Sequence, residues 1–140
     1  MIPGVTVVGI TKRHDARGWL AEILRAGQDI PAQAGQLYVT AARPGITKGH
    51  HYHTRKTEWF CVVQGEGRLE LEEMATGHRQ AIEMSQARMV RVTIPPGVGH
   101  AITNTGTGLL LLLVYVNEVF DPQDPDTLPM QPTAEAGRRS

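Results

Sequence analysis

The sequence lacks the features of a disulfide scaffold, a membrane span or a strongly charged surface. It contains one cysteine in 140 residues, so no disulfide can form within the chain. Its longest apolar run, Leu109 to Val116, is far shorter than the ~20 residues that a membrane-spanning helix needs. The 14 basic and 14 acidic residues cancel, which gives no support for binding to nucleic acid or to an anionic membrane. We therefore expect any ligand to be recognised by a local cluster of side chains.

Two further signals are missing. The N-terminus lacks the charged-then-apolar pattern of a signal peptide, which together with the single cysteine favours a reducing, cytoplasmic setting. There is no glycine-rich dinucleotide fingerprint, so a reductase acting with this chain would be a separate polypeptide. With 140 residues and 41% hydrophobic content, the chain is expected to form one domain with its own core.

Short segments with β-strand character, bounded by glycine or proline, follow one another along the chain. The pattern predicts strands over 5–10, 19–24, 36–41, 68–74, 79–84, 89–94 and 100–104 and along the apolar run that begins at 109. We expect the first two strands to form one hairpin, and 68–74 with 79–84 to form a second, exposed one. Such spacing favours an all-β sandwich or barrel. The composition changes after Phe120, so we expect a domain over 1–128 and a flexible tail without chemistry over 129–140.

Histidines and a glutamate carry the strongest functional pattern. His51 and His53 are two residues apart, so on an extended backbone they point to the same face. Glu58 shares a face with the apolar Phe60, where a carboxylate is costly unless a cation or a hydrogen-bond partner neutralises it. His100 follows a Pro-Pro-Gly turn that can bring it antiparallel to the first two histidines. Three imidazoles and one carboxylate suit a first-row divalent ion with open positions, although a hydrogen-bonded polar cluster without metal is the alternative.

The same residues resemble the cupin motifs. From Gly45, five residues precede His51, one separates it from His53, four more precede Glu58 and six more precede Gly65. The second motif is similar from Pro95-x-Gly97 through His100 to Asn104, and departs at its start, where Met89 replaces glycine. The resemblance implies an all-β cupin double-stranded β-helix, or jelly roll, with a metal held by His51, His53, Glu58 and His100. Zinc is the expected ion, with iron, manganese and nickel as alternatives.

A finer resemblance spans most of the chain. Several blocks are similar to the C-terminal cupin domain of bifunctional capsular-polysaccharide sugar reductase/epimerase enzymes, and more distantly to nucleotide-sugar 3,5-epimerases and 3,4-ketoisomerases: Arg17-Gly18-Trp19, Gln36 to Thr40, Lys48 to His53, Lys56 to Phe60, Asn117 to Pro122 and Asp124 to Thr127. The resemblance implies an epimerase or isomerase acting on a nucleotide-linked 4-keto-6-deoxyhexose, with proton abstraction next to the ketone, at C3, in polysaccharide or deoxysugar biosynthesis. The fold alone does not decide among these activities.

Such chemistry needs proton-handling groups close to the sugar and cations close to the diphosphate. The predicted catalytic residues are His50, Lys48 and Tyr38. The predicted substrate-binding residues are Arg55, Lys56, Arg91, Tyr115, Asn117 and Glu118. For His50 the alternative is a surface histidine, and for the lysines and Arg55 it is a solvated loop charge.

Two other functions use the same ligand set. One is an Fe(II)-dependent cupin dioxygenase, which oxygen uptake would reveal, and the other is a non-catalytic sugar-binding module that serves a separate reductase. The apolar N-terminal strand, which can add to a neighbour's sheet, predicts a homodimer.

Overall fold

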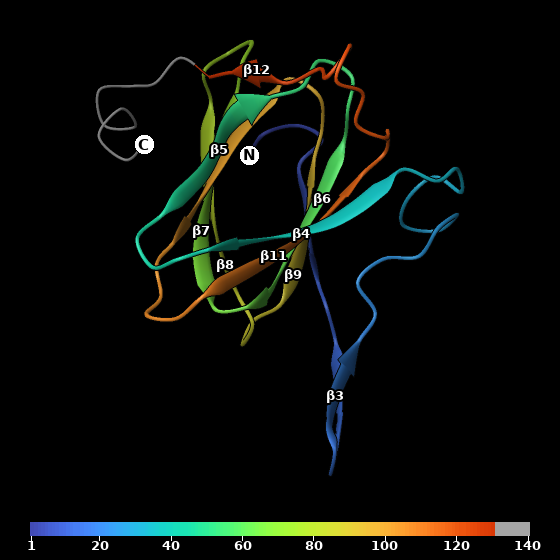
Figure 1. The fold of residues 1–140 in the computed structure, drawn as a ribbon, viewed down its shortest axis with the longest axis vertical. Helices are drawn as coiled ribbons and strands as arrows, with labels where there is room; N and C mark the ends of the chain where they lie inside the picture. The colour runs from blue at the N-terminus through green and yellow to red at the C-terminus, as the bar shows by residue number, and fades with distance from the viewer. Residues whose placement is uncertain (131–140) are drawn as a thin grey trace.

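The protein, described over residues 1–130 by a computed structural model, folds into two antiparallel β-sheets packed face to face (Figure 1). The first sheet has the strand order β1-β9-β6-β11-β4, the second has the order β12-β5-β10-β7-β8, and β2 pairs with β3 alone. The strands are β1 Thr6–Gly9, β2 Lys12–Asp15, β3 Gly18–Ala21, β4 Gln36–Ala42, β5 Thr47–Tyr52, β6 Glu58–Gln64, β7 Glu66–Glu73, β8 Arg79–Ser85, β9 Val90–Ile94, β10 Val98–Asn104, β11 Leu110–Val116 and β12 Leu128–Pro129. The predicted all-β jelly roll is confirmed.

The two sheets enclose one apolar core. Phe60 and Val62 of β6 pack there with alternate residues of β11, as the period of two in a strand requires. Burying side chains of this size stabilises the fold by about 1.5–3 kcal/mol each. Within the described residues no helix is long and apolar enough to cross a membrane.

The opposite face of the first sheet is covered in part. Tyr115 Oη accepts a hydrogen bond from the Gly35 backbone N–H at 2.6 Å, and Arg91 Nη1 donates one to the Ile23 carbonyl at 2.8 Å. The connection between β3 and β4 therefore lies over this face. Cys61 is 1% exposed there, and this burial raises the pKa of its thiol to about 11, as expected for a small buried hydrophobe.

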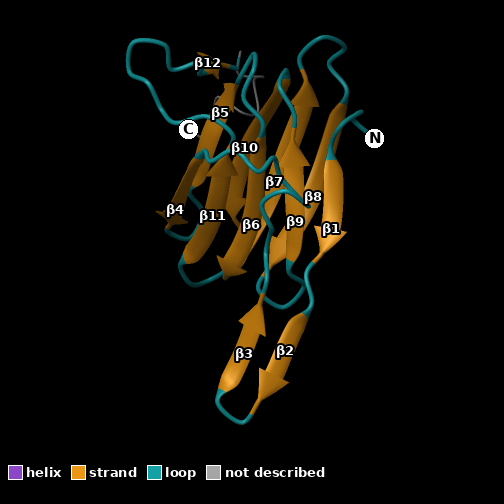
Figure 2. Cartoon of the chain, turned by 90° about the vertical axis from the view of Figure 1, so that its right-hand side faces the viewer, coloured by secondary structure: helices purple, strands orange, loops and turns teal. Residues whose placement is uncertain are grey.

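The predicted N-terminal hairpin is wrong in its pairing. β1 pairs with β9 of the main sheet, and the hairpin consists of β2 and β3 instead. It projects away from the sandwich (Figure 2). The turn explains the difference, because the Asp15 carboxylate accepts a hydrogen bond from the Arg17 backbone N–H and Gly18 takes a left-handed φ of 142°. These local bonds close the hairpin within residues 12–21.

The predicted hairpin of β7 and β8 exists, but it is not exposed as a unit. β7 also pairs with β10 along its length, so its inward residues Leu69 and Leu71 are only 0% and 2% exposed. The expected tail over 129–140 falls largely outside the described residues. Its first residues pair with the body, since Pro129 aligns with His51 and the Met130 backbone N–H donates to the His50 carbonyl at 2.9 Å.

Candidate metal and sugar site

Three neighbouring strands bring the predicted ligands together. His51 lies on β5 and aligns with His100 on β10, while Glu58 begins β6 and His53 follows β5. The ring centroids of His51 and His100 are 4.7 Å apart, and His53 is 5.4 Å from His51 and 5.6 Å from His100. One ligand atom from each of the four side chains lies within 4.8 Å of every other. The structure therefore brings the whole predicted ligand set into one cluster.

Hydrogen bonds orient the imidazoles of the cluster. His53 donates through Nδ1 to the Asp126 carbonyl at 2.6 Å, and its Nε2 lies 2.8 Å from Glu58 Oε1. His100 donates through Nδ1 to the Val98 carbonyl at 3.3 Å. Both rings thus use Nδ1 for a backbone carbonyl and present Nε2 to the centre of the cluster, which is the usual arrangement of metal-binding histidines.

His100 Nε2 is the atom that best tests whether a cation fits. It lies 3.0 Å from Glu58 Oε1, but outside hydrogen-bond geometry, and within residues 1–130 this buried nitrogen has no hydrogen-bond partner. Leaving such an atom unpaired is costly. A divalent ion ~2.0–2.2 Å from nitrogen and carboxylate ligands would satisfy it.

The protonation states of His51 and Glu58 also suit a cation. Burial, reinforced by the nearby His100, lowers the pKa of His51 to about 4, so its ring is neutral and has a free lone pair at pH 7. Burial would raise the pKa of Glu58, but the close imidazoles of His100 and His53 outweigh it and hold this pKa far below its ordinary value. Burial would lower the pKa of His53, but the bonds to Glu58 and Asp126 raise it. The carboxylate is therefore charged across the physiological range.

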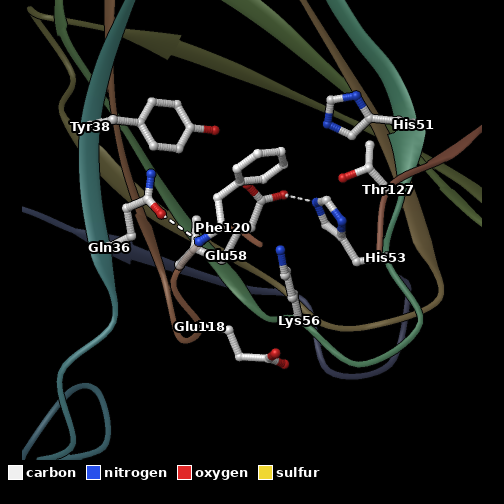
Figure 3. Close-up of a pocket in the computed structure, with 10 residues that line it drawn as sticks. Gln36, Tyr38, His51, His53, Lys56, Glu58, Glu118, Phe120 and Thr127 are labelled. Atoms are coloured by element: carbon white, nitrogen blue, oxygen red, sulfur yellow. Dashed lines mark hydrogen bonds and ion pairs between the residues drawn. The ribbon is translucent and has the colours of Figure 1, made fainter. Parts of the chain in front are cut away.

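The cluster opens into a small cavity of about 230 Å³ (Figure 3). His51, His53 and Glu58 form one wall, and Tyr38 of β4 faces them across the space. Lys56 is only 4% exposed, and its Nζ donates to the Pro125 carbonyl at 2.9 Å. A buried cation therefore lies in the wall of the same cavity as the anionic Glu58.

Of the predicted catalytic and substrate-binding residues, three line this cavity: Tyr38, Lys56 and Glu118. Tyr38 is 40% exposed, yet burial of its hydroxyl and the charge of Glu58 raise its pKa to about 12. Glu118 lies at the mouth and forms an ion pair with Arg55 at 3.0 Å.

The other predicted residues lie outside the cavity lining. Arg91 and Tyr115 are on the opposite face of the first sheet, bonded to the connection between β3 and β4. Asn117 accepts a hydrogen bond from the Thr57 backbone N–H, and Arg55 pairs with Glu118 and with Asp124. These side chains support the loops around the site.

Lys48 and His50 also lie outside the lining, and a β-bulge sets the local register of β5 at these residues. The register shifts between His100 and Ala101, so that His100 faces His51 while Ala101 faces Gly49, and His50 takes a left-handed φ of 61°. Lys48 is exposed and donates to Thr40 Oγ1 at 2.7 Å, beside the cavity.

Four residues of the lining carried no predicted role: Gln36, Val116, Phe120 and Thr127. The Gln36 side chain holds this wall by accepting a hydrogen bond from the Phe120 backbone N–H at 2.6 Å. Thr127 lies near the end of the predicted domain, just before the tail predicted over 129–140. Gln36, Phe120 and Thr127 fall in blocks of the finer resemblance, so that resemblance is the signal that could have identified them as site residues.

A jelly roll with three histidines and a glutamate converging from β5, β6 and β10 defines a cupin. The sequence matches the family described as "Polysaccharide biosynthesis C-terminal domain" over residues 13–128. The chain belongs to this family.

Three known proteins illustrate the relationship. The chain is 38% identical over 118 residues to "UDP-2-acetamido-2,6-beta-L-arabino-hexul-4-ose reductase" of Pseudomonas aeruginosa, covering 84% of this chain and 30% of that protein. It is 33% identical to the capsular polysaccharide assembling protein CapF of Staphylococcus aureus, with a TM-score of 0.68 over 87% of this chain and 34% of that one. A dTDP sugar isomerase of Desulfovibrio desulfuricans shares the fold at 17% identity, with a TM-score of 0.86 over 96% and 88%. The chain spans about a third of the first two proteins.

Proposed function

We propose that this domain is an epimerase or isomerase that acts on a nucleotide-linked 4-keto-6-deoxyhexose by removing and returning the proton on the carbon next to the ketone, at C3. The observation that carries the proposal is the cluster of the partly buried His51 with the buried His53, Glu58 and His100, which opens onto a cavity containing Tyr38 and Lys56. The names of the relatives, which include a reductase of a UDP-linked hexulose and a dTDP sugar isomerase, support this substrate class.

The four clustered side chains would hold a divalent ion, zinc first, with iron, manganese or nickel as alternatives. Such an ion supplies a Lewis acid that polarises a carbonyl oxygen. Side chains of the protein would carry out the other steps. Lys56, which is buried in the cavity wall, would hold its positive charge close to the oxygen on which negative charge develops.

Tyr38 is the proposed proton donor. Its pKa of about 12 keeps the phenol protonated at neutral pH, so it can give a proton and cannot take one. It faces the metal-ligand wall across the cavity (Figure 3), and a sugar bound between them would receive its proton from the β4 side. Inversion at carbon requires a proton delivered to the face opposite the one that lost it. The proton lost would pass to water on the metal-ligand side, and solvent would reprotonate Tyr38 after each turnover.

The size of the cavity indicates which part of the substrate it would enclose. At about 230 Å³ it lies below the ~300–1,000 Å³ of sites that enclose a drug-sized ligand. The keto-sugar ring would therefore occupy the cavity, and the nucleotide would lie across its mouth, where Phe120 is 55% exposed and Glu118 pairs with Arg55.

Solvent deuterium exchange tests the function. The purified chain should incorporate deuterium next to the ketone of a UDP- or dTDP-linked 4-keto-6-deoxyhexose, which mass spectrometry and NMR would locate. A dioxygenase would consume oxygen instead, and a sugar-binding module would exchange nothing. Absence of exchange across the substrate panel, with the metal present, would reject the proposal.

A Tyr38→Phe variant serves as the matched control in the same assay. It removes the phenolic proton and leaves the ring, so metal binding should persist. Exchange should continue while the fraction of inverted product falls about tenfold, because deprotonation is separate from delivery of the proton to the other face. Unchanged inversion would exclude Tyr38 as the donor.

We further propose that the chain is a homodimer and that it acts with a separate reductase. β1 is an edge strand of the first sheet, where Val7 and Val8 are 47% and 39% exposed, and Trp19 and Leu20 are exposed on the projecting hairpin (Figure 2). Apolar edges of this kind pair readily with another chain. Light scattering should give twice the 15.3 kDa chain mass, and a monomer at micromolar concentration would contradict the dimer.

A further inference from the structure

The segment that follows β11 returns to the metal-ligand cluster. β12 pairs with β5, so that Leu128 aligns with Tyr52 and Pro129 with His51. Asp126 lies two residues before this pairing and adopts a left-handed φ of 48°. This conformation is uncommon for a residue with a side chain and is kept where the surroundings hold it.

The Asp126 carboxylate binds the loop that joins two of the ligands. One oxygen accepts hydrogen bonds from the backbone N–H of Thr54, at 2.9 Å, and from its hydroxyl. The other accepts from the backbone N–H of Arg55, at 2.9 Å, and of Lys56, at 3.2 Å. Three consecutive backbone N–H groups, at positions 54 to 56 between His53 and Glu58 in the sequence, thus donate to one carboxylate.

The Asp126 backbone acts on the ligand itself. Its carbonyl accepts the Nδ1–H of His53 at 2.6 Å, which leaves His53 Nε2 directed at Glu58 Oε1. A bond of this kind to a metal-binding histidine fixes the tautomer and the ring orientation. One residue therefore holds both the ring of His53 and the loop after it, from a part of the chain 73 positions away.

We propose that Asp126 is a positioning residue for the metal site: its carbonyl orients His53, and its carboxylate fixes the loop from His53 to Glu58. The inference rests on the proposed function, because it assumes that an ion occupies the cluster. It assigns a role to the C-terminal segment that pairs with β5, and it makes metal affinity depend on how that segment is docked.

Two substitutions separate positioning from general stability. Asp126→Gly tolerates the left-handed backbone and removes only the carboxylate. Asp126→Asn retains one oxygen for Thr54, but its amide cannot accept from Arg55 and Lys56. Asp121→Gly is the matched control, since the carboxylate of Asp121 lies in the same segment and accepts a hydrogen bond from the Gln123 backbone N–H at 2.9 Å.

The experiment measures Zn²⁺ affinity of the full chain by chelator competition, together with the absorption spectrum of bound Co²⁺. Asp126→Gly should lower the affinity about 10- to 100-fold and alter the Co²⁺ spectrum, Asp126→Asn should fall between it and the wild type, and Asp121→Gly should match the wild type. A change in thermal midpoint alone, with affinity and spectrum unchanged in Asp126→Gly, would overturn the inference and leave the proposed function intact. A wild-type chain that binds no ion would overturn the metal-dependent function instead.

Discussion

Replacing His51 with alanine should abolish metal binding and substrate deuterium exchange together. The substitution removes one of four ligands that lie within 4.8 Å of one another, and it leaves His100 facing an empty space across the register pair. Loss of an outer hydrogen-bond partner alone costs ~10–100-fold in metal affinity, so loss of a ligand should cost more than about 100-fold. Exchange should fall by at least the same factor if it depends on the ion. Chelator competition and mass spectrometry would measure the two losses.

The matched control for this experiment is His78→Ala. His78 is an exposed residue of the turn between β7 and β8, far along the chain from the cluster, and the same side chain is removed. This control should retain metal and exchange. His51→Ala should also remain folded by circular dichroism, because His51 is only partly buried and lies outside the apolar core.

Two outcomes would contradict separate parts of the proposed function. Metal retained at wild-type affinity in His51→Ala would show that His51 is not a ligand. Exchange that survives both the substitution and treatment with a chelator would show that side chains alone stabilise the enolate, and Tyr38 and Lys56 would then be the groups to replace next.

The ligand cluster could be predicted because its geometry follows from the spacing of residues along strands. His51 and His53 share a face at a separation of two, and Glu58 begins the next strand of the motif with its side chain on the core side. The turn before β10 then places His100 opposite His51. Each step needs only local periodicity and one antiparallel pairing.

The residues around the cluster could not be predicted in the same way, because they depend on non-local bonds. Alternation alone would put Lys48 on the face opposite to His51, whereas the bulge at Gly49 and His50 shifts the register and aligns Lys48 with the buried Ile102. Arg91 and Tyr115 alternate with the core residues Val92 and Val114 and so face outward, where they bond to the connection after β3. Neither the bulge nor the covering loop has a signal in the strand pattern.

The contacts of the C-terminal segment could not be predicted from its composition. Its proline-rich and polar composition is typical of a mobile tail. Residues 126 and 127, just ahead of the tail predicted over 129–140, have specific contacts instead: Asp126 accepts hydrogen bonds from the 54–56 loop, and Thr127 lines the cavity. Composition indicates how little apolar surface a segment can bury, but it does not indicate which groups the segment's backbone carbonyls and carboxylates can bind.

Gly49→Ala should cause a large loss of stability through a single methyl group beside the metal ligands. Gly49 has a φ of 107°, and a Cβ there would lie 2.7 Å from the His100 carbonyl oxygen and 3.2 Å from the Ala101 Cα. The left-handed backbone costs a residue with a Cβ ~1–2 kcal/mol, and the overlap with a backbone atom adds ~1–3 kcal/mol. We expect the free energy of unfolding of the metal-free chain to fall by about 2–4 kcal/mol in urea titrations. Because His100 must move to relieve the overlap, metal affinity should fall as well.

Gly77→Ala is the control that separates the cost of the left-handed backbone from the cost of the overlap. Gly77 has a similar left-handed φ of 77°, but a Cβ there would meet nothing within 4 Å, so this variant should lose only the backbone cost of about 1–2 kcal/mol and keep its metal affinity. The difference between the two variants then measures how closely β5 approaches β10 beside the ligands. If both variants lose equal stability and Gly49→Ala binds Zn²⁺ as tightly as the wild type, the bulge is not packed against His100, and the close approach of the two strands does not set the position of that ligand.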